Sequence, residues 1–514
     1  MFAATMRSGA ARFAAALSAF AALAGASPAP TAVPDPASVP DPVVTPAYIE
    51  YLPTKTRPQR RDIIDALGSA AESVLGSLPS YVVSGVQEWG LNLPTGDAVQ
   101  SSLSVSDDDL DALPTQVMNI PPYANWTDQG WNVRFHGNVY KQPNLSEDRL
   151  NELADIFLPD VDAEDLPPDQ AEQARNLTGA IFVVQQDDEN VTMHIEPAPS
   201  AGSSGEEGGG GATTPEGGYQ NITLPYETTE LGDFDAFVPI ELNGLTPGNE
   251  TDEIQRLNVY AQGATLGNAT AYLVPPTGLT IISDIDDILR VTKIYDPEEG
   301  LLNTFARPFR PWMNMPDIYA NWSRSLDNAH FHYLTTTPEQ GTRLYMDFIY
   351  KTYPGGSFDT RPLNFSDVSA TLSIRKYLLD RVLDTFPQRK FVLVGDTTNS
   401  DVMSDYPQLA QERPDQVQCI LLRNTSATDD SNHFPYDTSD FENLNNQSYM
   451  FFRTPDDLMG LDIEGGNCLN ASVRQNVTFG YQNLPFGEDA AVTVFPNAFF
   501  SVMAAALAMT WLLV

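Results

Sequence analysis

The sequence has few cysteines and few basic residues, and both shortages exclude classes of protein. Only two cysteines occur in 514 residues, which excludes a disulfide scaffold and a zinc site built from cysteines. The 28 lysines and arginines are outnumbered by 68 aspartates and glutamates, which gives a formal net charge of −40. Nucleic acid would repel such a chain, so no nucleic-acid partner is expected. No P-loop sequence occurs either, so ATP hydrolysis of that kind has no support.

The chain is long enough for two or more domains, and hydrophobic residues make up 42% of it, which is enough for folded cores. Residues 82–275 contain short apolar runs separated by turn residues, a pattern typical of a β-rich, sandwich-like domain. Within them, the Gly, Ser and Glu residues of 200–218 indicate a flexible insertion. Residues 278–455 alternate strand-like runs with helical patterns, which predicts an α/β domain with a parallel sheet. Residues 456–488 form a C-terminal extension.

Both ends of the chain have the composition of targeting segments. Residues 1–26 contain Arg7 and Arg12, then an apolar run and small residues, as a secretory signal peptide does. Residues 27–80 read as a Pro- and Ala-rich stalk followed by a short amphipathic helix. The apolar end of 489–514 fits either a GPI-anchor signal or a single membrane span. We therefore expect the protein in the secretory pathway, tethered to a membrane surface at the cell exterior or in an endomembrane lumen.

Two further features bear on export. Many Asn-x-Ser/Thr sequences are spread along the chain, and their density favours a glycoprotein of the secretory route. The two cysteines, Cys419 and Cys468, either form a disulfide in that compartment or remain apart. Because Cys419 lies in a strand-like run, it is equally well explained as a buried thiol.

Polar side chains follow three of the strand-like runs in the α/β region. They are Asp284 and Asp286 after the run 279–282, Thr335 after 331–334, and Asp396 with Asp401 after 391–394. In open α/β sheets the ligand lies beyond the carboxyl ends of the strands, so these groups should converge. Carboxylate and hydroxyl oxygens suit Mg²⁺, and we expect the four aspartates to form its site. Arg290 and three further basic residues follow the first strand and either face an anionic substrate or are surface charges.

The order of these groups resembles the haloacid dehalogenase superfamily of aspartyl-phosphate phosphatases. Its pattern is DxDx(T/V), then a strand-end Thr or Ser, then a basic residue, then GDxxxxD. The chain is similar to the phosphatidate phosphatase catalytic domain first described in the fungal actin-patch family. The supporting stretches are SDIDD from Ser283, FHYLT from Phe331, FPQRKFVLVGDT from Phe386 and VQCILLR from Val417. The resemblance covers about 278–455 and implies a Rossmann-like, haloacid dehalogenase-like phosphatase domain.

The resemblance also implies a role for each group. Asp284 matches the nucleophile that forms an acyl phosphate. Asp286 matches the general acid that protonates the leaving oxygen and then activates water, which requires the two carboxylates to have unlike environments. Asp396 completes the Mg²⁺ site and Asp401 ligates the metal or orients one of its waters. Thr335 donates a hydrogen bond to the phosphoryl group.

One position departs from the family pattern and one stays open. Ile288 stands where Thr or Val is usual, and as a β-branched residue it should fill the same packing role. The family's basic residue belongs on the helix expected over 372–386, where Arg375 and Lys376 both lie near the apolar stripe. The spacing from Pro387 favours Arg375, whereas the residue type favours Lys376.

The sequence thus predicts a Mg²⁺-dependent phosphomonoesterase. Phosphatidate, hydrolysed to diacylglycerol, is the substrate that the resemblance implies, since the residues themselves reveal no lipid pocket. The same chemistry on a soluble phosphate ester or a phosphoprotein is the first alternative. The second is a non-catalytic, anchored glycoprotein whose β-rich domain binds a partner that the residues do not identify.

Overall fold

The computed structural model describes most of the chain between residues 96 and 482. The described residues are 96–158, 161–198, 218–241, 253–361, 374–429, 436–480 and 482. All of them belong to the same compact unit. The expected signal peptide, stalk, amphipathic helix and membrane anchor lie outside them, as does all but the last residue of the expected insertion. Within the described residues, every helix is too short or too polar to cross a membrane.

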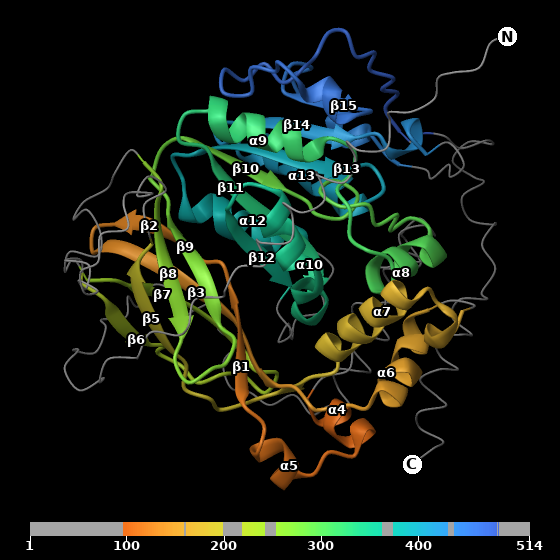
Figure 1. Cartoon of the computed structure of the whole chain (residues 1–514). Coiled ribbons are helices and arrows are strands. Elements are labelled where there is room, and N and C mark those ends of the chain that lie inside the picture. Colours follow the sequence, from red (N-terminus) through yellow and green to blue (C-terminus); the bar gives the residue numbers. More distant parts are fainter. Residues whose placement is uncertain are drawn as a thin grey trace, which may run out of the picture. The chain divides into compact units, whose positions relative to one another are not determined.

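The N-terminal part of the described chain forms a nine-stranded sheet in which every pairing but that of β2 with β9 is antiparallel (Figure 1). Its longest strand, β3, pairs with β1, β2, β4 and β7, and its apolar residues Trp131, Val133 and Phe135 alternate into one core. The β-rich character is confirmed, whereas the sandwich arrangement stays a prediction. The strands are β1 (Thr115–Ile120), β2 (Tyr123–Thr127), β3 (Gly130–Lys141), β4 (Val184–Gln185), β5 (Thr192–Pro197), β6 (Gln220–Thr223), β7 (Asp233–Pro239), β8 (Gln255–Ala261) and β9 (Asn268–Leu273).

Helices that the sequence analysis did not anticipate lie before and between these strands. They are α4 (Gly96–Leu103), α5 (Asp107–Asp111), α6 (Glu147–Ala154) and α7 (Pro168–Ile181). Ser146 begins α6 by accepting a hydrogen bond from the Arg149 amide at 3.3 Å. The buried face of α7 includes Ala171, Ala174 and Ile181. These positions have helical spacing, but alanine is only weakly hydrophobic, so the helical period is faint in the hydropathy pattern.

The C-terminal part contains a six-stranded sheet in the order β12-β11-β10-β13-β14-β15, with all neighbours parallel. The predicted parallel sheet is therefore confirmed. The four runs identified in the sequence became β10, β11, β13 and β14, and two further strands were not predicted. The strands are β10 (Leu279–Ser283), β11 (His330–Pro338), β12 (Ser357–Arg361), β13 (Lys390–Asp396), β14 (Val417–Arg423) and β15 (Tyr449–Phe452).

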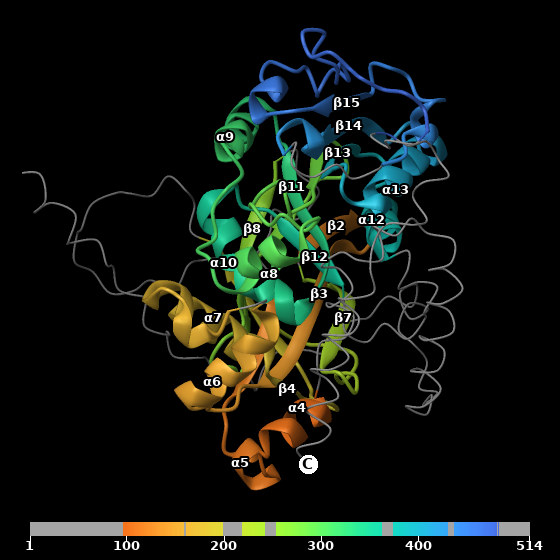
Figure 2. The ribbon, with the colours of Figure 1, turned by 90° about the vertical axis from the view of Figure 1, so that its right-hand side faces the viewer.

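Helices cover both faces of the parallel sheet. Successive residues of β10 show this: Ile281 packs in the core that contains α9 and α10, and Ile282 packs in the core that contains α12 and α13. Figure 2 shows these two helix pairs on opposite sides of the strands. With both faces covered, polar groups on the strands reach a ligand only at the edge where the strands end. The helices are α8 (Pro297–Phe305), α9 (Met315–Ser325), α10 (Glu339–Thr352), α12 (Ile374–Thr385) and α13 (Ser400–Glu412).

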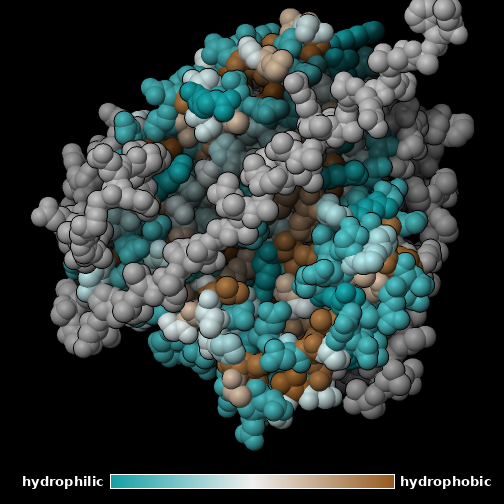
Figure 3. All heavy atoms as spheres, in the orientation of Figure 1, coloured by the Kyte–Doolittle hydropathy of each residue, from teal (hydrophilic) through white to brown (hydrophobic). Residues whose placement is uncertain are grey.

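Polar side chains dominate the described part of the molecular surface seen in Figure 3, with apolar groups scattered among them. Large hydrophobic side chains that are exposed include Met313, Met459 and Phe479. Most apolar side chains of the two sheets lie instead in the three buried clusters. The stability of the described unit therefore comes mainly from these cores.

A buried ion-pair network joins the two sheets. The guanidinium of Arg134 on β3 donates to both oxygens of Asp359 on β12, at 2.8 and 2.9 Å, and to both oxygens of Asp235 on β7, each at 2.9 Å. Burial alone would raise the pKa of Asp359, but Arg134 holds it well below its usual value. Asp235 also pairs with Arg381 on α12. The antiparallel sheet is therefore tied to a strand of the parallel sheet and to one of the helices that cover it.

The two cysteines are paired. Cys419 on β14 forms a disulfide with Cys468, which lies 49 residues further on. Cys468 belongs to the expected C-terminal extension, so the bond fastens that segment to the parallel sheet. The structure thus decides between the two alternatives left open by the sequence.

Candidate active site

Five of the predicted site residues line one small cavity at the carboxyl edge of the parallel sheet. Its volume is about 20 Å³, which is enough for one water molecule or one ion. The strands explain the convergence: Asp284 directly follows β10 and Asp396 ends β13, and the Asp284 amide donates to the Val394 carbonyl at 2.9 Å. The lining residues are Asp284, Asp286, Ile294, Thr335, Thr336, Thr337, Arg375, Asp396 and Asn399.

Asp284 is a buried carboxylate that faces a guanidinium. Its Oδ2 lies 3.2 Å from Nη2 of Arg375, and its Oδ1 accepts a hydrogen bond from the Ile285 amide at 2.9 Å. Burial raises the pKa of Asp284 to about 6, with Arg375 opposing the rise and the charge of Asp286 adding to it. Both carboxylate oxygens of Asp284 are therefore held by contacts, and the group is largely ionised at neutral pH.

Asp286 has a different environment. Its Oδ1 accepts hydrogen bonds from Arg290 Nε at 3.0 Å and from Thr292 Oγ1 at 2.8 Å. Among the described residues, its Oδ2 has no hydrogen-bond partner. The two aspartates thus lie in unlike surroundings, one against Arg375 and the other against Arg290 and a hydroxyl. One oxygen of Asp286 remains available for a proton or a ligand.

Asp287, the third aspartate of the motif, organises the backbone. It has a left-handed φ of 59°, and its carboxylate accepts hydrogen bonds from the amides of Thr292, Lys293 and Ile294 at 3.2, 2.7 and 2.9 Å. Arg423 at the end of β14 donates to the Asp287 carbonyl. These contacts fix the turn that carries Asp286, a role for which the sequence carried no signal.

Thr335 and Asp396 complete the cavity wall. Thr335 Oγ1 accepts hydrogen bonds from the Thr337 amide at 3.1 Å and from the Tyr345 hydroxyl at 3.4 Å. Both of its lone pairs are used, so its own hydroxyl proton can be donated to a ligand. Asp396 accepts a hydrogen bond from the Thr398 amide at 2.7 Å. Burial raises the pKa of Asp396 to about 7, with further contributions from the charges of Asp287 and Asp284.

The structure distinguishes the two candidate basic residues. Arg375 is buried and contacts Asp284, whereas Lys376 pairs with Asp380 at 2.8 Å and with Glu412 at 2.9 Å, away from the cavity lining. Asp401 is likewise not among the lining residues. It is partly buried, and burial raises its pKa while the charge of Arg375 opposes the rise. Of the seven predicted site residues, Lys376 and Asp401 are therefore the two outside the cavity wall.

Three arginines of the parallel-sheet region, of which Arg375 lines the cavity, have buried donors without partners. Nε and Nη1 of Arg375, Nη1 of Arg290 and Nε of Arg423 are buried and make no hydrogen bond within the described residues. A buried donor that lacks a partner costs free energy unless a ligand supplies an acceptor. An anion with several oxygens, such as a phosphoryl group, would satisfy such donors. Of these three arginines, Arg375 is the one that lines the cavity, so its donors are placed for this contact.

The cavity is lined by carboxylate oxygens that could bind a divalent cation. Asp284, Asp286 and Asp396 line it, and Mg²⁺ binds such oxygens while it keeps several waters. In the described part of the chain, no group of three or more His, Cys, Asp or Glu side chains lies close enough together to hold a metal ion, and Asp286 is bound to Arg290. The raised pKa values of Asp284 and Asp396 are nevertheless what a nearby cation would lower. The donor chemistry therefore fits Mg²⁺.

Five of the six strands of the parallel sheet, together with the cavity, lie in a segment that matches a known catalytic domain. Residues 279–424 match the family described as "Phosphatidate phosphatase APP1, catalytic domain". This segment begins with β10 and ends just after β14, so it contains all seven predicted site residues. The chain therefore resembles this family of phosphatases in its catalytic region, and the recognition made from the sequence is confirmed.

A yeast protein is similar to part of this chain. The chain is 28% identical over 161 residues to the phosphatidate phosphatase APP1 of Saccharomyces cerevisiae. The aligned part covers 30% of this chain and 27% of the yeast protein. The likeness is thus confined to about a quarter of the relative's length, and the antiparallel sheet falls outside the matched family segment.

Proposed function

We propose that this chain is a Mg²⁺-dependent phosphatase that hydrolyses a phosphomonoester through an aspartyl phosphate, with phosphatidate as its substrate and diacylglycerol as the product. The observation that carries this proposal is the Asp284–Arg375 pair at 3.2 Å, in a cavity that Asp286, Thr335 and Asp396 also line. The family resemblance and the name of the yeast relative support the reaction class and the lipid substrate.

In the first step, an oxygen of Asp284 attacks phosphorus and the bond to the leaving alkoxide breaks. Asp286 gives its proton to the leaving-group oxygen, so the alcohol leaves as a neutral molecule. In the second step, Asp286 takes a proton from water, and the hydroxide attacks the aspartyl phosphate. Phosphate is released and the Asp284 carboxylate is regenerated. The partner-free donors of Arg375 and the hydroxyl of Thr335 are suited to bind the phosphoryl oxygens.

Asp284 and Asp396 would hold Mg²⁺, and the ion would supply positive charge against the phosphoryl oxygens. The negative charge of Asp401 contributes to the raised pKa of Arg375, which suits an orienting role for Asp401. We also propose that the protein is exported and tethered to a membrane, where phosphatidate headgroups would be within reach. The Cys419–Cys468 disulfide supports an oxidising compartment.

The test is phosphate release by the purified full chain from phosphatidate in detergent micelles and from p-nitrophenyl phosphate, with Mg²⁺ or with EDTA. We expect release that requires Mg²⁺ and is lost in Asp284→Asn. The matched control is Asp317→Asn, an exposed position in the first turn of α9, which should keep full activity. Release from the small ester but not from phosphatidate would transfer the proposal to soluble substrates. A folded protein that releases phosphate from neither would refute it.

A further inference from the structure

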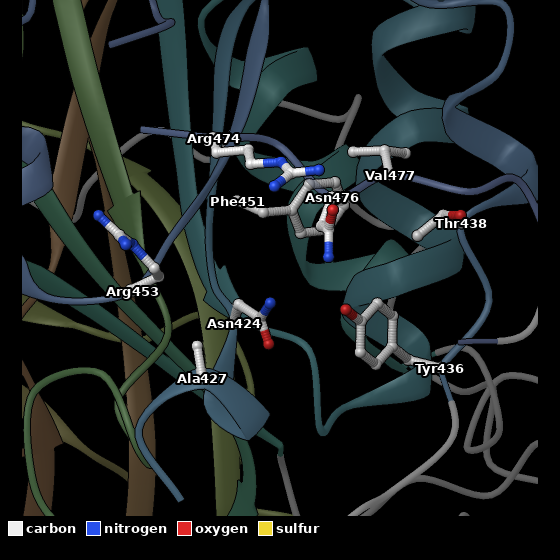
Figure 4. Close-up of a pocket in the computed structure, with 9 residues that line it drawn as sticks. All are labelled: Asn424, Ala427, Tyr436, Thr438, Phe451, Arg453, Arg474, Asn476 and Val477. Atoms are coloured by element: carbon white, nitrogen blue, oxygen red, sulfur yellow. The ribbon is translucent and has the colours of Figure 1, made fainter. Parts of the chain in front are cut away.

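A second, larger cavity opens at the same carboxyl edge of the parallel sheet, beyond the strands of the active site. Its volume is about 230 Å³, many times the space that one water molecule needs. It lies at the ends of β14 and β15, and it shares no lining residue with the first cavity. Figure 4 shows its lining residues, which are Asn424, Ala427, Tyr436, Thr438, Phe451, Arg453, Arg474, Asn476 and Val477.

The charge of this lining is opposite to that of the chain. The lining contains two arginines and no carboxylate, in a protein whose net charge is −40. Arg453 pairs with Asp457 at 3.3 Å, and Figure 4 shows its guanidinium pointing away from the other side chains. Arg474 is exposed, lines the cavity together with Phe451, and has no ion-pair partner among the described residues. Arg474 therefore supplies one uncompensated positive charge at the cavity.

Neutral polar groups in the cavity also lack partners. Tyr436 is only 5% exposed, and its hydroxyl makes no hydrogen bond within the described chain. Asn424 Oδ1 is a buried acceptor that receives no hydrogen bond there. In Figure 4 the Tyr436 hydroxyl and the Asn476 side chain point toward the space above Asn424. The cavity thus offers donors that suit an anion and an acceptor that needs a donor, such as a hydroxyl group.

We propose that this cavity binds a small phosphate ester that carries free hydroxyl groups. The phosphate would lie against Arg474 and the Tyr436 hydroxyl, and a ligand hydroxyl would donate to Asn424 Oδ1. Such a group occurs in soluble esters such as glycerol 3-phosphate, and also in lipid headgroups such as that of phosphatidylglycerol. This site is separate from the catalytic one, so it adds a ligand position to the proposed phosphatase.

The experiment measures binding without turnover. The full chain carries Asp284→Asn and is produced in a secretory host, and mass spectrometry establishes whether Asn424 and Asn476, which each begin an Asn-x-Ser/Thr sequence, carry a glycan; a glycan at either position would fill the cavity and refute the site. Calorimetry with glycerol 3-phosphate, inorganic phosphate and glycerol, in EDTA, gives the dissociation constants. A parallel sedimentation assay uses vesicles of phosphatidylcholine with or without phosphatidylglycerol.

The decisive comparison is Arg474→Gln against Arg324→Gln, an exposed arginine on α9. We expect Arg474→Gln to weaken binding of glycerol 3-phosphate, or of phosphatidylglycerol vesicles, at least tenfold, and Arg324→Gln to leave it unchanged. If Arg474→Gln weakens binding of glycerol 3-phosphate, the ligand is a free ester. If it weakens binding of phosphatidylglycerol vesicles, the ligand is a lipid headgroup. Equal affinity for inorganic phosphate and glycerol 3-phosphate would refute the hydroxyl contact. Binding that ignores Arg474→Gln, or no binding in either arm, would refute the site. Because no step requires hydrolysis, these outcomes are independent of whether the chain is a phosphatase.

Discussion

Replacing Arg375 by methionine probes the proposed mechanism at its central contact. Methionine keeps a long, unbranched side chain but removes the guanidinium that lies 3.2 Å from Asp284. The first loss is stabilisation of charge on the phosphoryl group, for which Nε and Nη1 have no other partner in the described chain. Removing one donor of this kind typically lowers kcat by about 10²- to 10³-fold, or about 3–4 kcal/mol.

The second loss concerns the ionisation of Asp284. Burial raises its pKa to about 6 against the opposing charge of Arg375, so at pH 7 the charged form exceeds the neutral form about tenfold. Without Arg375 this pKa rises, and each unit above 7 removes about another factor of ten from the rate at pH 7. We therefore expect a total loss of about 10³-fold or more. The acidic limb of the kcat/KM profile should also move to higher pH.

The assay is hydrolysis of p-nitrophenyl phosphate between pH 5 and 9, with circular dichroism to verify folding. Lys376→Met is the matched control, because Lys376 is the neighbouring residue and its ammonium group pairs with Asp380 and Glu412. It should stay within about threefold of the wild type, as expected for exposed ion pairs. The reasoning fails if the Lys376 variant loses more activity than the Arg375 variant. It also fails if the Arg375 variant keeps an unchanged acidic limb.

Three further predictions concern stability. In EDTA the melting temperature of the wild type should fall from pH 5 to pH 8 relative to that of the variant with both Asp284→Asn and Asp396→Asn, because burial raises the pKa of Asp284 to about 6 and of Asp396 to about 7; the opposite contribution of buried histidines such as His136, whose pKa burial lowers, is shared by both proteins. The stability that the two carboxyl groups contribute below pH 4 is lost as the pH rises through those pKa values. Mg²⁺ should therefore raise the melting temperature more at pH 8 than at pH 5. An equal effect of Mg²⁺ at the two pH values would contradict this. Cys468→Ser should lower the free energy of unfolding in urea by about 4 kcal/mol, since the disulfide closes a loop of 49 residues; an unchanged urea midpoint would count against it. Arg134→Met should lower the free energy of unfolding by about 3–5 kcal/mol, because Asp359 stays buried without its cation. Adding Asp359→Leu should recover part of that loss. Additive losses in the double variant would contradict the pairing.

The sequence was most informative about the ends of the strands. Asp284, Thr335 and Asp396 were expected together because the carboxyl ends of parallel strands share one edge, and all three line the cavity. The apolar runs before them are unusually clear, since strands buried on both faces are continuously hydrophobic. Local pattern and motif order therefore sufficed for this part of the candidate site.

The choice between Arg375 and Lys376 was beyond the sequence for a geometric reason. Neighbouring positions on a helix differ by about 100° in direction, so the exact rotation of α12 decides which side chain enters the cavity. Helix packing sets that rotation through apolar contacts such as those of Leu378 and Leu379. Spacing had favoured Arg375, which contacts Asp284, and residue type had favoured Lys376, which does not.

Contacts between distant segments left no local signal at all. Arg134 and Asp359 are 225 residues apart, and neither belongs to a recognisable motif. The Arg423 contact with Asp287 likewise joins two strand ends that only the folded sheet brings together. Such pairs depend on tertiary packing, which propensity and periodicity do not encode.

The link between β3 and β12 limits how the catalytic region can be exchanged between proteins in evolution. A recombination event that transferred residues 279–424 alone would carry Asp359 into a new host without the arginine that neutralises it. Such a chimera would have to supply another cation, or replace the aspartate by an apolar residue, before it could fold. Tyr123 and Tyr272, which share a core with α12 and α13, would be lost at the same time. The two sheets are thus expected to be inherited together, and changes at Arg134 to be accompanied by changes at Asp359.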